Sequence, residues 1–143
     1  MTFAKEVERE TKHLANEAEK LAAAVIIEVF ASVIGDTPAE TGRLRGNWQT
    51  TQLAPAGSEL VRDQKEKDSG PATSDVFATI RKPNRYFLTN NLPYAEVAEY
   101  GKWGRGPGAT AKTAGTGFSI QAPAGMVRIN VRRVDAILNR LQK

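Results

Sequence analysis

The apolar residues in the first quarter of the chain recur at steps of three, four or seven positions, the spacing of one face of an α-helix. They are Phe3, Val7, Leu14, Ala18, Leu21, Val25, Val29 and Val33. Thr2 can cap the start and Gly35 can stop the end, so we expect a helical N-terminal segment 1–34 with its helix over residues 3–34. At 1.5 Å per residue this helix would be roughly 48 Å long. A domain of this size needs less, so we expect the charged early turns to project from the body.

Shorter patterns follow this helix. Alternation of apolar and polar residues predicts three strands, over residues 46–53, 75–82 and 86–91. Residues 93–100 predict a short helix that starts at Pro93 and stops at Gly101, and the tail 126–141 predicts a C-terminal helix with one apolar stripe. The predicted fold class is therefore α+β, with a small antiparallel sheet covered by the long N-terminal helix and the C-terminal helix.

Two stretches, residues 54–74 and 102–117, show no periodicity and are rich in glycine, proline or charge. We expect both to be extended loops that are mobile in the isolated chain and become ordered in an assembly. Because 143 residues suit one domain, we expect a single domain over residues 1–143.

Composition and motifs argue against catalysis. The chain has no cysteine and a single histidine, His13, and we find no zinc, serine-hydrolase or nucleotide-loop motif. We therefore predict no enzymatic activity, no cofactor and no metal. No run of 18 apolar residues is present, so we expect no membrane contact and a site of synthesis in the cytoplasm.

Charge is divided unevenly along the chain. The formal net charge is +4, but residues 1–42 carry −4 and the remainder carries +8. This division allows an acidic helix of one copy to pair with a basic region of the next. It equally allows a basic surface for nucleic acid, formed by Arg43, Arg45, Arg81, Lys82, Arg85, Lys102, Arg105 and Lys112.

Three segments resemble one protein family. They are TPAETGRLRGNW at residues 37–48, NNLPYAEVAEYG at 90–101 and APAGMVR at 122–128. In this order they resemble the tail-completion and head–tail joining proteins, the neck and tail-terminator-like proteins, of long-tailed bacteriophages. The resemblance implies a non-enzymatic virion structural protein that forms a ring, often a hexamer, around the DNA channel. Its partners would be its own copies, other neck, tail or connector proteins and DNA in the channel. It would be made in the host cytoplasm and end in the virion.

Within these segments we expect Thr37 and Thr41 to stabilise a helix-to-strand corner, and Trp48 to lie in the core or at an interface. We expect Arg43 and Arg45 to pair with the acidic first helix of a neighbouring copy. We expect one of two tyrosines in the short helix to pack inward while the other meets a partner. The remaining interface candidates come from that helix and the glycine-rich stretch: Tyr94, Glu96, Glu99, Tyr100, Lys102, Arg105 and Lys112.

Overall fold

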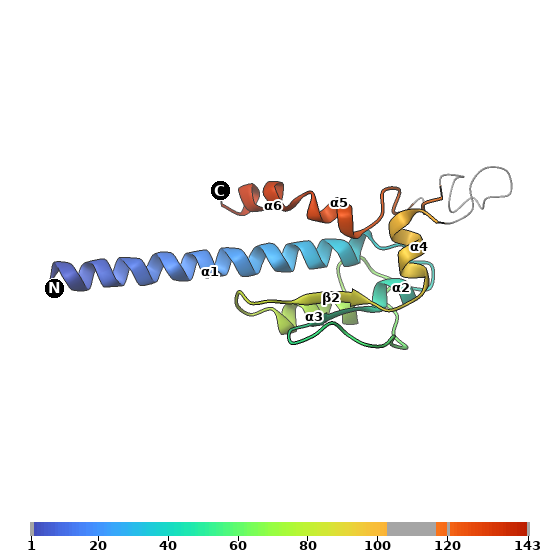
Figure 1. Ribbon diagram of the computed structural model, residues 1–143, viewed down its shortest axis with the longest axis horizontal. Coiled ribbons are helices and arrows are strands. Elements are labelled where there is room, and N and C mark those ends of the chain that lie inside the picture. Colours follow the sequence, from blue (N-terminus) through green and yellow to red (C-terminus); the bar gives the residue numbers. More distant parts are fainter. Residues whose placement is uncertain (1, 103–116, 120, 143) are drawn as a thin grey trace.

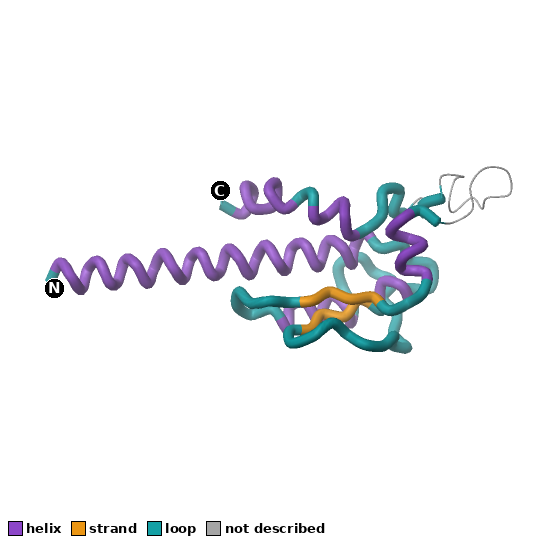
Figure 2. Tube along the Cα trace, in the orientation of Figure 1, coloured by secondary structure: helices purple, strands orange, loops and turns teal. Residues whose placement is uncertain are grey.

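A computed structural model describes residues 2–102, 117–119 and 121–142, and within them the fold is α+β (Figure 1). One long helix runs beside a compact body, and a C-terminal pair of helices lies along the opposite side of it from the sheet (Figures 1 and 2). The elements in chain order are α1 Phe3–Asp36, α2 Arg43–Gly46, β1 Trp48–Thr51, α3 Pro71–Thr79, β2 Phe87–Asn90, α4 Tyr94–Tyr100, α5 Val127–Val131 and α6 Val134–Leu141.

The predicted N-terminal helix is confirmed and runs two residues further than expected. Thr2 caps it, because its hydroxyl accepts a hydrogen bond from the Lys5 N–H at 3.3 Å. Residues 2–20 are all exposed, and Figure 1 shows this half of α1 extending away from the body. The expected projection of the early turns is therefore confirmed, and only the half after residue 20 packs against other elements.

The chain reverses direction between α1 and β1 through a tight corner. Gly42 has a φ of +89°, where a side chain would be strained, and an added Cβ would lie 2.7 Å from the Gln64 backbone. Thr41 stabilises the corner as expected, since its hydroxyl accepts a hydrogen bond from the Arg43 N–H at 3.3 Å. The short helix α2 completes this corner and ends at Gly46, and β1 follows within the predicted strand 46–53.

The described residues hold one antiparallel sheet of two strands, not three. β1 pairs with β2 in a register that joins Trp48 to Asn90 and Thr51 to Phe87. The predicted strand over residues 75–82 is wrong, because residues 71–79 form helix α3 (Figure 2). Pro71 stands at the first turn of this helix, where its missing N–H costs nothing.

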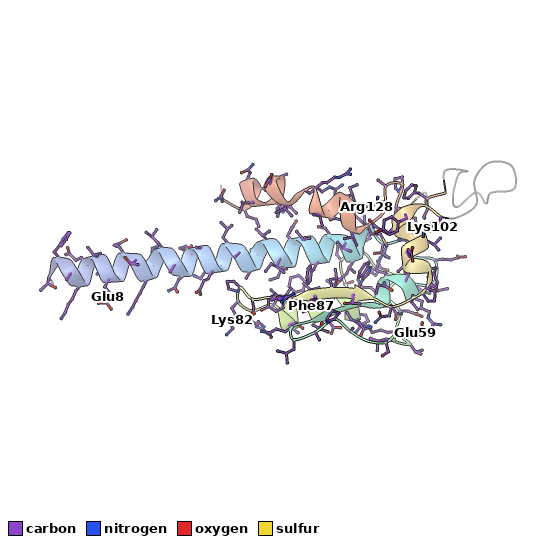
Figure 3. All side chains as sticks on the ribbon, in the orientation of Figure 1. Glu8, Glu59, Lys82, Phe87, Lys102 and Arg128 are labelled. Carbon is purple, nitrogen blue, oxygen red and sulfur yellow. The ribbon has the colours of Figure 1, made fainter. Side chains whose placement is uncertain are left out.

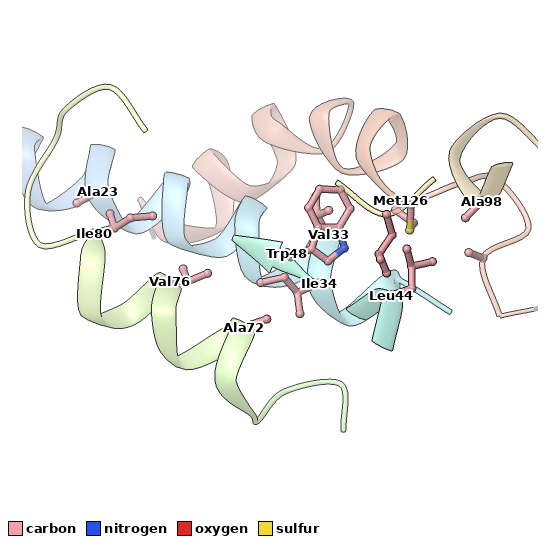
Figure 4. Close-up of a cluster of buried hydrophobic side chains, with 12 residues drawn as sticks. Ala23, Val33, Ile34, Leu44, Trp48, Ala72, Val76, Ile80, Ala98 and Met126 are labelled. Carbon is pink, nitrogen blue, oxygen red and sulfur yellow. The ribbon is translucent and has the colours of Figure 1, made fainter. Parts of the chain in front are cut away.

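The core lies between α1, α3 and the sheet, and its buried side chains appear in Figure 4. Ala72, Val76 and Ile80 are at most 2% exposed and lie four residues apart, so they form one buried edge of α3. Opposite them α1 contributes Val33 and Ile34, which are also almost fully buried. This face-to-face burial of apolar surface is the main source of stability for the body.

Residues 58–70 follow the surface of the body as a strap instead of extending from it. Arg62 fixes the strap, because its guanidinium donates to the carbonyls of Gly46 and Trp48 at 2.7 and 2.8 Å and to Asp75 at 2.7 Å. The Leu60 N–H donates to the Asn47 side chain at 2.7 Å. The predicted loop over residues 54–74 therefore lacks helix and strand as far as residue 70, but its last four residues belong to α3. That this segment is mobile in the isolated chain and ordered in an assembly stays a prediction. The second predicted loop, residues 102–117, lies outside the described residues except for its two ends.

The C-terminal tail forms two short helices where the sequence predicted one. α5 and α6 are separated at Arg132 and Arg133, and α6 runs antiparallel to α1. Arg140 pairs with Glu28 at 2.5 Å and Arg133 pairs with Asp36 at 3.6 Å. None of the helices in the described part of the chain has the length and apolar character that a membrane crossing requires.

Candidate assembly interface

The three family-like segments meet at one end of the body. The Asn90 side chain donates to the Leu44 carbonyl at 2.7 Å, which joins the second segment to the first. The Ala39 N–H donates to Gln121 at 2.9 Å, which joins the first segment to the approach of the third. Glu99 then binds the backbone of residues 126–128. We call these three segments, residues 37–48, 90–101 and 122–128, the motif cluster.

Thr37 and Trp48 hold the two ends of the first segment together. The Thr37 hydroxyl donates to the Val33 carbonyl at 2.7 Å and accepts the Trp48 indole N–H at 2.7 Å. Both residues are buried, with Thr37 fully inaccessible and Trp48 5% exposed. Trp48 is therefore a core residue, and its indole N–H has the partner that a buried donor needs.

Arg45 is also part of the interior, which corrects the expectation that it faces a neighbouring copy. It is 4% exposed, and its guanidinium donates to the carbonyls of Thr37 at 2.7 Å, Gly35 at 3.4 Å and Lys65. Its charge lies at the C-terminal end of α1, where a cation is favourable. Burial lowers the pKa of Arg45, and nearby carboxylates including Glu66 partly offset that shift.

Arg43 has a different environment from Arg45. Its side chain is 42% exposed and lies 3.5 Å from Glu59 across the surface. The Glu59 label in Figure 3 marks this part of the body. Arg43 therefore remains a candidate for contact with another chain, whereas Arg45 does not.

Glu99 anchors the third segment to α4 and is 8% exposed. Its carboxylate accepts the N–H groups of Met126 and Val127 at 2.7 Å each and of Arg128 at 3.1 Å, and also pairs with the Arg128 guanidinium at 2.8 Å. Burial alone raises the pKa of Glu99, but these hydrogen bonds together hold it below its ordinary value. The sequence placed Glu99 on a solvated or interface face, and the structure instead makes it a buried anchor.

The exposed side of the motif cluster is formed by α4 and its neighbours. Tyr100 is 51% exposed, with the Arg128 guanidinium 4.7 Å and the Lys102 ammonium 5.8 Å from the centre of its ring. Lys102 also pairs with Glu96 at 2.5 Å, and hydrogen bonding to Lys102 lowers the pKa of Glu96. Tyr94 is 38% exposed, so the expectation that one tyrosine packs inward is wrong. We call Glu96, Tyr100, Lys102 and Arg128 the aromatic–charged patch; Tyr94 is six residues from Tyr100 and so lies on a different face of α4.

The glycine-rich stretch begins and ends beside this patch. Gly101 lies directly against the Phe118 ring, and any Cβ at this position would overlap with the ring. The Lys102 N–H donates to the Val97 carbonyl at 3.0 Å. Two interface candidates in the stretch, Arg105 and Lys112, lie outside the described residues.

The basic residues that the structure describes do not gather on one surface. Lys82 and Lys102 lie at opposite ends of the body (Figure 3), and Arg45 is buried. Arg81, Lys82 and Arg85 share the connection between α3 and β2, where all three are exposed. Within the described residues, no group of three or more histidine or acidic side chains is placed to hold a metal ion.

Comparison of the chain with protein-family models, with curated protein sequences and with solved structures finds no match.

Proposed function

We propose that this chain is a non-enzymatic structural protein of a tailed-phage virion, where copies form a ring that completes the tail or joins it to the head. The observation that supports this proposal is the convergence of the three family-like segments. Residues far apart in the sequence, such as Leu44 and Asn90 or Glu99 and Met126, bind each other within one motif cluster. If the three segments resembled the phage proteins only by chance, there would be no reason for them to contact each other in the fold.

The motif residues divide into two groups that suit an assembling protein. Thr37, Arg45 and Glu99 stabilise the cluster from within. The aromatic–charged patch presents Tyr100 and Arg128, and Tyr94 is exposed on another face of α4. Tyrosine and arginine often dominate the energy of protein interfaces. We assign the patch to contact with another chain of the ring or with a neck, tail or connector protein.

The exposed area of the chain also favours assembly. Residues 3–20 of α1 are all exposed and extend away from the body, so their surface is open to contact with another chain (Figure 1). In a ring, each copy would cover such area on both sides, around a channel that DNA can enter.

The decisive experiment is electron microscopy of a lysate from a phage that lacks this gene. We expect filled heads and separate tails, because the joining step would fail. Complementation with the wild-type gene should restore joined particles, and complementation with a Tyr94→Ala plus Tyr100→Ala variant should not. Phe77→Ala is the matched control, because Phe77 is a similarly exposed aromatic residue on α3. Joined, infectious particles in the absence of the gene would remove the proposal.

A small basic nucleic-acid-binding protein is the second candidate, and the exposed cations of residues 81–85 favour it. Such a protein would bind duplex DNA as a monomer, with an affinity that falls steeply as salt rises. Replacing Arg81, Lys82 and Arg85 by glutamine would then abolish binding and reduce the salt dependence. For a ring component, the same triple variant should still assemble.

A further inference from the structure

The projecting half of α1 carries a line of apolar residues that the described part of the chain leaves uncovered. Phe3, Val7 and Leu14 are 80%, 48% and 67% exposed. They are four and seven positions apart, so they lie on one side of the helix, and Ala18 extends the line. Single exposed apolar residues are ordinary, but several on one side of a projecting helix mark an interaction surface. We call Phe3, Val7, Leu14 and Ala18 the apolar stripe.

The apolar stripe continues directly into the face of α1 that α6 covers. Leu21, Val25 and Glu28 follow Ala18 at steps of three and four, and Leu21 and Val25 are partly buried. On this face Arg140 of α6 pairs with Glu28 at 2.5 Å. The stripe is therefore the uncovered continuation of an interface that already exists within the chain.

Glutamates accompany the stripe along one edge, and Glu28 continues this line beneath α6. Glu10 and Glu17 precede Glu28 by 18 and 11 residues, which are about five and three turns of helix. All three glutamates consequently occupy the same angular position on α1. The projecting half thus repeats the combination with which the other half holds α6, an apolar row with a glutamate beside it, where Glu28 binds Arg140.

From this repetition we propose that the apolar stripe is the docking site for an amphipathic helix of another protein, which runs antiparallel to α1. This helix carries an apolar face for the stripe and arginine or lysine along the edge that meets Glu10 and Glu17. Helix-in-groove recognition of this kind combines apolar anchors with charges that set orientation. The inference goes beyond the proposed function and does not depend on it.

A second copy of this chain fits the stripe poorly. Two α1 helices packed antiparallel through their stripes would bring Glu10 and Glu17 of one copy against the same residues of the other, and like charges repel. Parallel packing would bring the two α6 helices against each other, because each α6 covers the face of its own α1 that continues the stripe. Helix α6 of another copy is also occupied, since its Ile137 is buried and its Arg140 is paired within its own chain.

The test is amide NMR spectroscopy of the full-length protein, with a synthetic peptide of residues 127–142 as the basic amphipathic probe. We expect saturable shifts of the amides of residues 3–20. Glu10→Lys plus Glu17→Lys should weaken this binding about tenfold, since two interfacial charge pairs are reversed. The matched control is Glu8→Lys plus Glu19→Lys, which adds the same charge about half a turn away and should leave binding unchanged.

Exchange of the charges provides the complementary test. A peptide with Arg133→Glu and Arg140→Glu should bind the Glu10→Lys plus Glu17→Lys variant better than the original peptide does. No shifts within residues 3–20 at about millimolar peptide would overturn the proposal. Shifts confined to residues 21–36 would also overturn it, because the peptide would merely be replacing α6. A protein dimer in sedimentation that Leu14→Glu abolishes would show that a second copy covers the stripe.

Discussion

The Thr37 hydroxyl accepts the indole N–H of Trp48 at 2.7 Å and so joins the end of α1 to the start of β1 in the buried corner. Thr37→Val removes this acceptor while it keeps the shape of the side chain. We expect a loss of about 1–3 kcal/mol in the free energy of unfolding, because a buried donor is left without a partner. Urea unfolding followed by Trp fluorescence measures this loss. Thr11→Val is the control on the exposed half of α1 and should change stability little.

The second prediction compares the contributions of Arg45 and Arg43 to the free energy of unfolding. Arg45→Met keeps the apolar length but leaves the carbonyls at the end of α1 without their donor. We expect a loss of about 2–4 kcal/mol in the free energy of unfolding. Arg43→Met should cost less than about 1 kcal/mol, because the pair between Arg43 and Glu59 is exposed. Equal losses for the two variants would contradict the assigned roles.

The acid sensitivity of Glu99 is the third prediction. Its pKa in the folded chain lies below the ordinary value of 4.5, so the carboxylate stabilises the fold at neutral pH. That contribution is lost as the pH falls below 4.5 through the pKa of the folded state. At pH 7 we expect Glu99→Gln to cost about 1.5–3 kcal/mol.

Thermal and urea unfolding between pH 7 and pH 3 would check this behaviour. The difference between the wild type and Glu99→Gln should shrink as the pH falls. Glu96→Gln is the control on the same helix, where the carboxylate is exposed and its loss should leave the unfolding midpoint at pH 7 almost unchanged. A constant difference between the wild type and Glu99→Gln across this range would count against the ionised anchor.

The fourth prediction concerns the corner glycine. Gly42→Ala introduces a Cβ at a positive φ and 2.7 Å from the Gln64 backbone, and the strap cannot shift without losing its own hydrogen bonds. We expect destabilisation by more than about 1 kcal/mol. Gly57→Ala is the matched control, because nothing lies within 4 Å of an added Cβ there. A neutral Gly42→Ala would show that the corner can rearrange.

The α+β fold class and the first helix could be predicted because long periodic patterns and chain order carry that information. Helix α3 could not be separated from a strand by the same means, since Val76, Ala78 and Ile80 alternate while Val76 and Ile80 also stand four apart. The stronger signals were Pro71 at the helix start and the continuation of the spacing to Ala72. Tertiary contact with α1 decides the outcome in favour of the helix.

The candidate site was predicted less well than the fold, and the reason is physical. Side chains such as Arg45 and Glu99 look like surface charges in a sequence, because burial of a charge depends on partners that the fold supplies. For Glu99 those partners are backbone N–H groups 27 to 29 residues away. Arg128, the exposed partner of Glu99, belongs to the third family-like segment. Nothing in the sequence near either residue indicates that the two side chains meet.

Because α1 is one continuous helix, it fixes the direction in which the apolar stripe faces relative to the body. Each residue turns the helix by about 100° and advances it by 1.5 Å. An insertion of seven residues after position 20 would carry the stripe about 10 Å outward with almost no rotation. An insertion of five would turn it about 140°, away from the side on which α6 lies. Evolution or design can therefore change the reach of this arm by close to a whole number of turns, such as about two, three or five, whereas other lengths would redirect the face that it presents.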